Sequence, residues 1–148
     1  VTQAFEDTLA QVAKLALFIP MLIGAGGNAG AQAATASVRA LAIGEARFSD
    51  LGRVIWRELR VGLLLGLMLA ALGLVVGGFF VSWPIASVVA ASLVVICTWA
   101  ATIGGAMPLI ARRIGIDPAV VSAPLVTTLV DATGLVIYFS LAKVILGL

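Results

Sequence analysis

Long stretches without a charged residue divide this chain. Residues 15–38 and 61–111 contain no Asp, Glu, Lys or Arg, and residues 118–142 contain only one. A helix needs about 20 apolar residues to cross the hydrocarbon of a bilayer, so 61–111 is long enough for two spans. The segment 79–84 divides it, because its Pro suits a helix start and its Trp suits a membrane interface. The pattern predicts four membrane-spanning helices, at roughly 12–38, 61–81, 84–109 and 120–146.

Composition places these helices in a bilayer rather than in a soluble core. Of the 148 residues, 62% are hydrophobic and 11% are charged, whereas an ordinary soluble domain has about 25% charged residues. We therefore expect an all-α, polytopic membrane helix bundle in which residues 1–148 form one integral-membrane domain. The chain begins with Val1 and shows no signal-peptide pattern, which favours a piece of a longer protein.

The positions of the basic residues predict an orientation. Seven of the nine basic residues fall in the segments 39–60 and 111–119, which two predicted spans separate. Both segments then lie on one side of the membrane, and the positive-inside rule makes that side the cytoplasm. Both ends of the chain are expected outside a plasma or inner membrane. Segment 45–60 also contains three acidic residues, which favours a helix at the cytoplasmic interface over a nucleic-acid- or lipid-binding basic patch.

Several chemistries do not fit this composition. The chain has no histidine and one cysteine, Cys97, within the apolar sequence SLVVICTWA. Catalysis by histidine and an intrachain disulfide are therefore excluded, and packing is the usual role of such a thiol. The sequence GAGGNAG, residues 24–30, lacks the Gly-Lys-Ser/Thr that completes a phosphate loop. No nucleophile–base pair is visible, so we expect no enzymatic activity and no nucleic-acid partner.

Asp131 lies well inside the last predicted span. A carboxylate at that depth costs at least about 2.5–3.5 kcal/mol, so it should face a partner or water. Thr127 lies one turn earlier and Pro124 two turns earlier on the same helix face, and Thr128 lies three residues back. Pro124 has no N–H, so the Val120 carbonyl would lose its helical partner. Together these groups predict a cation path lined by oxygen atoms.

A polar stripe on the first predicted span supports the same interpretation. Asn28, Gln32 and Thr35 recur with helical spacing on an otherwise apolar helix. A ridge of small residues, which lets another helix approach closely, runs beside them at Gly26, Gly30 and Ala34. Two alternatives remain open. The stripe could serve only to pack helices, and Asp131 could be protonated or paired with a lysine such as Lys14.

A divalent cation would suit these oxygen atoms. Mg²⁺ prefers oxygen ligands and keeps several of its waters. One Asp131 per chain leaves such an ion half neutralised, whereas a two-fold homodimer supplies two carboxylates. Asp117, which precedes Pro118, is typical of a helix N-cap, or alternatively would attract cations to a pore entrance. Oxygen ligands also bind Mn²⁺ and Co²⁺, so the sequence does not rank the three ions.

Two motifs in order carry a resemblance to a known family. They are PMLIGAGGNAGAQAAT, residues 20–35, and DPAVVSAPLVTTLVDATGL, residues 117–135, and they resemble the transmembrane domain of the MgtE family of magnesium channels and transporters. The resemblance implies a homodimer with five helices per subunit and a pore on the two-fold axis. It also implies that a first helix and cytoplasmic acidic and CBS domains belong to the whole protein, with residues 1–7 as an outer loop.

The resemblance further implies roles for individual residues. Asp131 would be the principal magnesium residue, Asn28 and carbonyls near Thr127 would contact the hydrated ion, and Asp117 would lie toward the cytoplasmic opening. The residues expected to contact Mg²⁺, as the transported and bound ion, are Asp131, Asn28, Thr127, Thr128, Gln32 and Asp117.

The leading functional hypothesis is a passive, Mg²⁺-selective conduction path formed by a homodimer in the lipid bilayer. The alternative is a proton- or sodium-coupled carrier in which Asp131 titrates during the transport cycle. A third class is a structural membrane subunit in which Asp131 only bonds across helices.

Overall fold

The computed structural model describes residues 10–121 and 123–147, and these contain helices, turns and bends but no strand. A first helical segment, residues 10–16, is followed by a turn at 17–18. The long helices are α2 (Ile19–Ala42), α3 (Leu51–Phe80), α4 (Trp83–Arg113) and α5 (Ala123–Leu146). Two short 3-10 helices, η1 (Phe48–Asp50) and η2 (Pro118–Val120), precede α3 and α5.

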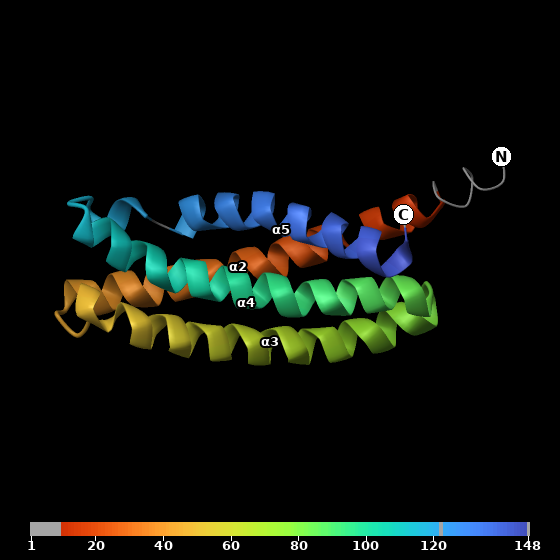
Figure 1. Ribbon diagram of the computed structural model, residues 1–148, viewed down its shortest axis with the longest axis horizontal. Coiled ribbons are helices and arrows are strands. Elements are labelled where there is room, and N and C mark those ends of the chain that lie inside the picture. Colours follow the sequence, from red (N-terminus) through yellow and green to blue (C-terminus); the bar gives the residue numbers. More distant parts are fainter. Residues whose placement is uncertain (1–9, 122, 148) are drawn as a thin grey trace.

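The described chain contains four helical regions that are long and apolar enough to cross a membrane. They are Ala10–Ala42, Phe48–Phe80, Trp83–Arg113 and Ala123–Leu146, and they run lengthwise beside one another in Figure 1. The prediction of an all-α membrane helix bundle is therefore confirmed. Each predicted span corresponds to one of these regions.

The boundaries differ most at the second span. The predicted span 61–81 is only the later part of α3, which begins at Leu51 and continues without a break. The prediction of a separate surface helix over 45–60 is therefore wrong for residues 51–60. The physical reason is packing, because Val54 and Glu58 in this region are buried and hold the helix against the bundle.

The last span also begins later than predicted. Helix α5 starts at Ala123 rather than at residue 120, so Pro124 stands in its first turn, where a missing N–H is tolerated. Val120 belongs to η2 and has no helical partner within α5 to lose. The predicted disruption of the Val120 carbonyl by Pro124 is therefore wrong.

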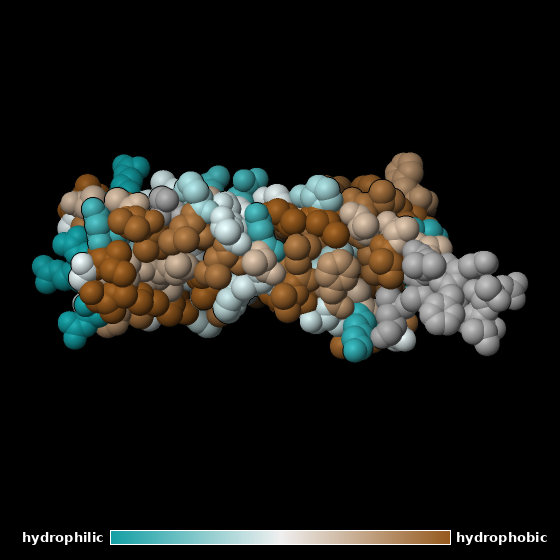
Figure 2. All heavy atoms as spheres, turned by 90° about the horizontal axis from the view of Figure 1, so that it is seen from above, coloured by the Kyte–Doolittle hydropathy of each residue, from teal (hydrophilic) through white to brown (hydrophobic). Residues whose placement is uncertain are grey.

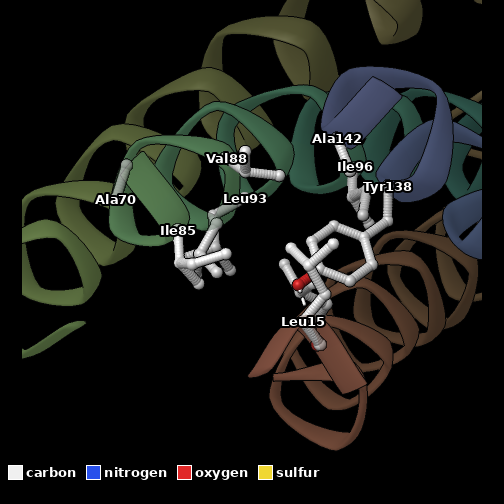
Figure 3. Close-up of a cluster of buried hydrophobic side chains, with 10 residues drawn as sticks. Leu15, Ala70, Ile85, Val88, Leu93, Ile96, Tyr138 and Ala142 are labelled. Carbon is white, nitrogen blue, oxygen red and sulfur yellow. Dashed lines mark hydrogen bonds between the residues drawn. The ribbon is translucent and has the colours of Figure 1, made fainter. Parts of the chain in front are cut away.

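The first span is interrupted between residue 16 and α2. Pro20 lies in the first turn of α2 and cannot donate a hydrogen bond to the preceding turn. The backbone there makes the shorter bonds of a 3-10 turn, from Leu17 N to the Lys14 carbonyl at 3.3 Å and from Phe18 N to the Leu15 carbonyl at 3.1 Å. The Tyr138 hydroxyl of α5 also donates to the Leu15 carbonyl, at 2.8 Å, as Figure 3 shows. This hydrogen bond links the interrupted segment to α5.

Helix α4 is the centre of the bundle and contacts α2, α3 and α5. Its crossing with α2 brings two backbones together, since a Cβ atom added to Gly104 would collide with the Gly30 carbonyl. Only glycine fits at this position of α4. The main buried apolar cluster comprises Leu15, Leu22, Ala70, Ile85, Val88, Val89, Leu93, Ile96, Tyr138 and Ala142.

The two ends of the bundle differ in character. Segments 43–50 and 114–121 lie at one end, on the left in Figure 1, whereas the turn between α3 and α4 lies at the other. Hydrophilic side chains gather mainly at the left end in Figure 2, and hydrophobic ones cover most of the remaining visible face. The two basic segments thus lie at the same end of the bundle, as expected, whereas their position relative to a membrane stays a prediction. The cytoplasmic location of this end stays a prediction as well, and the expected outer loop, residues 1–7, lies outside the described residues.

Candidate ion site between α2 and α5

Asp131 of α5 faces Gly27 of α2. A Cβ atom added to Gly27 would lie 3.5 Å from Asp131 Oδ1 and 3.5 Å from Thr127 Cγ2. The predicted shared face of Asp131 and Thr127 is therefore confirmed, and it points toward α2. Because Gly27 has no side chain, the carboxylate lies close to the α2 backbone.

One oxygen of this carboxylate is buried without a partner. Asp131 Oδ1 is inaccessible to solvent and accepts no hydrogen bond within the described chain. Lys14 does not compensate it, since the ion pairs among residues 10–121 and 123–147 are Arg53–Asp50 and Arg57–Glu58. A buried polar atom without a partner costs free energy. A proton, a cation or a group from another chain would remove that cost.

Two hydroxyl oxygens lie at the start of the same helix. Thr127 Oγ1 and Thr128 Oγ1 both donate to the Pro124 carbonyl, each at 2.9 Å. These bonds use the hydroxyl protons and leave oxygen lone pairs free to accept. Thr127 is half-buried and Thr128 is exposed. The first turns of α5 therefore present acceptor oxygens one turn before Asp131.

The polar stripe of α2 lies elsewhere on the surface of the single chain. Asn28, Gln32 and Thr35 are exposed and line a shallow groove of 510 Å³ whose walls all belong to α2. Asn28 and Gln32 also line a larger groove of 940 Å³ that includes residues of α3 but not Asp131. Within the described chain, no hydrogen bond joins this stripe to Asp131. That the stripe and Asp131 belong to one ion site stays a prediction. It requires a structural element beyond the described chain to bring them together.

Asp117 caps the short helix η2. Its Oδ1 accepts from the Ala119 N–H at 2.9 Å, and the residue is exposed. The N-cap interpretation is therefore confirmed, although the cap belongs to η2 rather than to the membrane span. A role in attracting cations stays a prediction.

Glu58 was not singled out from the sequence, although its carboxylate is buried. The residue is 6% exposed, and its Oε1 accepts from Arg57 Nε at 3.0 Å and Nη2 at 2.8 Å. It packs on Gly105 of α4, where an added Cβ would lie 2.5 Å from Glu58 Cγ. The signal was present in the spacing, because Glu58 is four residues from Val54 and from Gly62, which are also buried.

Comparison with known proteins supplies the wider context. A family model described as MgtE, a divalent cation transporter, matches residues 19–141. Three curated relatives are each named magnesium transporter MgtE. The protein from Thermus thermophilus is 46% identical over 99% of this chain and 32% of its own length. Those from Enterococcus faecalis and Bacillus subtilis are 34% and 36% identical over 94% and 93% of this chain, and 31% of their own lengths. The chain spans about a third of the length of these relatives.

Proposed function

This chain belongs to the MgtE family of divalent cation transporters, and from that premise we propose that it forms the Mg²⁺ pathway of a membrane channel or transporter. The observation that carries the proposal is the buried Oδ1 of Asp131, which faces Gly27 and has no partner in the described chain. An intramembrane carboxylate without a protein partner is typical of an ion path. Mg²⁺ is the transported substrate in this proposal.

A homodimer completes the site. The exposed amides of Asn28 and Gln32 lie within a helix that is apolar enough to span a membrane, and lipid tails offer amides no hydrogen bonds. A second copy placed against the α2–α5 face would cover this stripe and supply a second Asp131 carboxylate. Two carboxylates neutralise one divalent ion, which gives the association a physical motive.

The ion would cross with part of its water shell. Mg²⁺ dehydrates reluctantly, and it is held in proteins through one or two carboxylates and several waters. The Thr127 and Thr128 hydroxyls and the Asn28 amide oxygen would accept hydrogen bonds from those waters. In this arrangement Asp131 supplies negative charge, while Asp117, which precedes the amino-terminal start of α5, attracts ions toward the path.

Calorimetric titration of the purified protein with Mg²⁺ tests the ion site. We expect binding in the unaltered protein, its loss in Asp131→Asn, and its retention in Asp50→Asn. The control removes a partly exposed carboxylate that pairs with Arg53 and lies outside the two grooves lined by Asn28 and Gln32. Helicity and oligomeric state are compared first, so that a folding defect is recognised. Binding that persists unchanged in Asp131→Asn would remove Asp131 from the site and overturn the proposal.

A coupled carrier is the second candidate, because an unpaired carboxylate oxygen can also accept a proton. Reconstituted liposomes separate the two functions. A channel takes up Mg²⁺ electrogenically without a pH or sodium gradient, whereas a carrier requires such a gradient and dissipates it. Loss of uptake when both gradients are removed would favour the carrier.

A further inference from the structure

Three arginines, one from the segment between α2 and η1 and two from the last turn of α4, line one pocket at the end of the bundle that carries both basic segments. The pocket has a volume of 340 Å³, and its walls come from the end of α2, the segment 44–48 and the end of α4. The arginines are Arg47, Arg112 and Arg113. Residues more than 60 positions apart in the sequence thus contribute positive charge to one small volume.

Two of the three side chains are held by contacts at the pocket. Arg112 Nη1 donates to the Leu41 carbonyl at 3.3 Å, near the carboxyl end of α2, and the same carbonyl also accepts from Gly44 N at 3.3 Å. The Arg113 guanidinium carbon lies 5.6 Å from the centre of the Phe48 ring, within the range of a cation–π interaction. These contacts restrain the two side chains before any ligand binds, so that binding costs less side-chain conformational entropy.

The charge of this pocket is not balanced within the described chain. Its lining contains no carboxylate, and the ion pairs of the described residues involve Arg53 and Arg57 rather than these three arginines. Asp50, which is close in sequence, accepts from the backbone N–H of Arg47 at 3.0 Å and pairs with Arg53. Three like charges around one pocket repel one another, and an anion would relieve that repulsion.

We infer that the pocket binds the phosphate of an anionic phospholipid headgroup. The segment 45–60 alone did not favour a lipid-binding patch, but the structure adds Arg112 and Arg113 of α4 to Arg47 of that segment. Guanidinium groups match phosphate oxygens in geometry as well as in charge, and basic pockets at the ends of membrane spans bind lipid headgroups. Large apolar side chains at the same end are exposed, namely Ile43 by 58%, Ile114 by 65% and Ile116 by 44%. They suit contact with acyl chains beside the headgroup. This site is distinct from the Mg²⁺ path, because none of its residues belongs to the α2–α5 face.

Titration of the detergent-solubilised protein with short-chain phosphatidylglycerol and phosphatidylcholine tests this site. We expect tighter binding of the anionic lipid, and each of Arg47→Gln and Arg113→Gln should weaken it about fivefold. Arg60→Gln is the matched control, since Arg60 is exposed and outside the pocket. High salt should reduce the preference of the unaltered protein for phosphatidylglycerol, which gives a readout that needs no variant.

Three outcomes would overturn the inference. Equal binding of the two lipids would mean that the pocket does not recognise the negative charge of the headgroup. An equal loss in Arg60→Gln would show a diffuse effect of surface charge rather than a pocket. Displacement of the lipid by low concentrations of inorganic phosphate would assign the pocket to the free anion. Mg²⁺ titration of the same variants should remain unchanged, which separates this test from that of the ion path.

Discussion

Gly27 leaves the space that the carboxylate of Asp131 occupies beside α2. An added Cβ would lie at ordinary contact distance, 3.5 Å, from Asp131 Oδ1 and Thr127 Cγ2, so Gly27→Ala should fold normally. Gly27→Val adds two further methyl groups in the same volume, and overpacking costs about 1–3 kcal/mol. We expect Gly27→Ala to keep Mg²⁺ binding and to melt at the same temperature or slightly higher, because alanine favours the helix, and Gly27→Val to lower both the melting temperature and the binding. Equal behaviour of the two variants would contradict the close approach of α5 to this position.

The hydrogen bond from Tyr138 to the Leu15 carbonyl gives a second prediction for one residue. Tyr138→Phe removes a buried donor, and a typical hydrogen bond contributes about 1 kcal/mol. Because Leu15 also accepts from Phe18 N, its carbonyl keeps one partner, and the loss should stay near that value. Hydrogen exchange should quicken in residues 10–18, while Mg²⁺ binding is unchanged. Unaltered exchange in that segment would show that the hydroxyl does not hold it.

At the scale of the elements, the crossing of α2 and α4 requires glycine at position 104, because any side chain there would collide with the α2 backbone. Gly104→Ala forces the two helices apart at Gly30, which should destabilise the bundle by about 1–3 kcal/mol or more. Gly24→Ala on α2 is the matched control, because an added Cβ there meets nothing within 4 Å, and alanine favours the helix by about 1 kcal/mol. Thermal melting in detergent should separate the two variants in opposite directions.

The sequence predicted the existence of the long helices better than their boundaries and their packing. Charge-free stretches predicted every long helix, because hydropathy is a local property of the chain. The start of α3 at Leu51 was not predicted, since it depends on the burial of Val54 and Glu58 by a distant helix. Helical spacing placed Thr127 on the face of Asp131 correctly. It did not indicate that Gly27 opposes them, because the rotation of one helix against another is set by long-range packing.

At the scale of the whole molecule, the proposed homodimer predicts which surface meets a second copy. Thr35 on the exposed stripe of α2 should lie near its two-fold counterpart, whereas Met68 on α3 is 72% exposed and should face lipid. In a Cys97→Ala background, which removes the single native cysteine, Thr35→Cys should form disulfide-linked dimers in membranes. Met68→Cys should remain monomeric on a non-reducing gel. The reverse result would place the interface on α3.

The length of α3 has a consequence for the membrane around the protein. The helix has 30 residues and is therefore about 45 Å long, whereas its charge-free part, 61–80, covers only about 30 Å, the thickness of bilayer hydrocarbon. Trp56 and Arg60, whose guanidinium carbon is 5.7 Å from the Trp56 ring centre, mark the boundary between these parts. A thicker bilayer would draw the buried Glu58 and its Arg57 partner into hydrocarbon, at a cost of a fraction of a kcal/mol for each Å of hydrophobic mismatch. We therefore expect the bundle to be most stable in a bilayer whose hydrocarbon thickness matches the charge-free part of α3, residues 61–80.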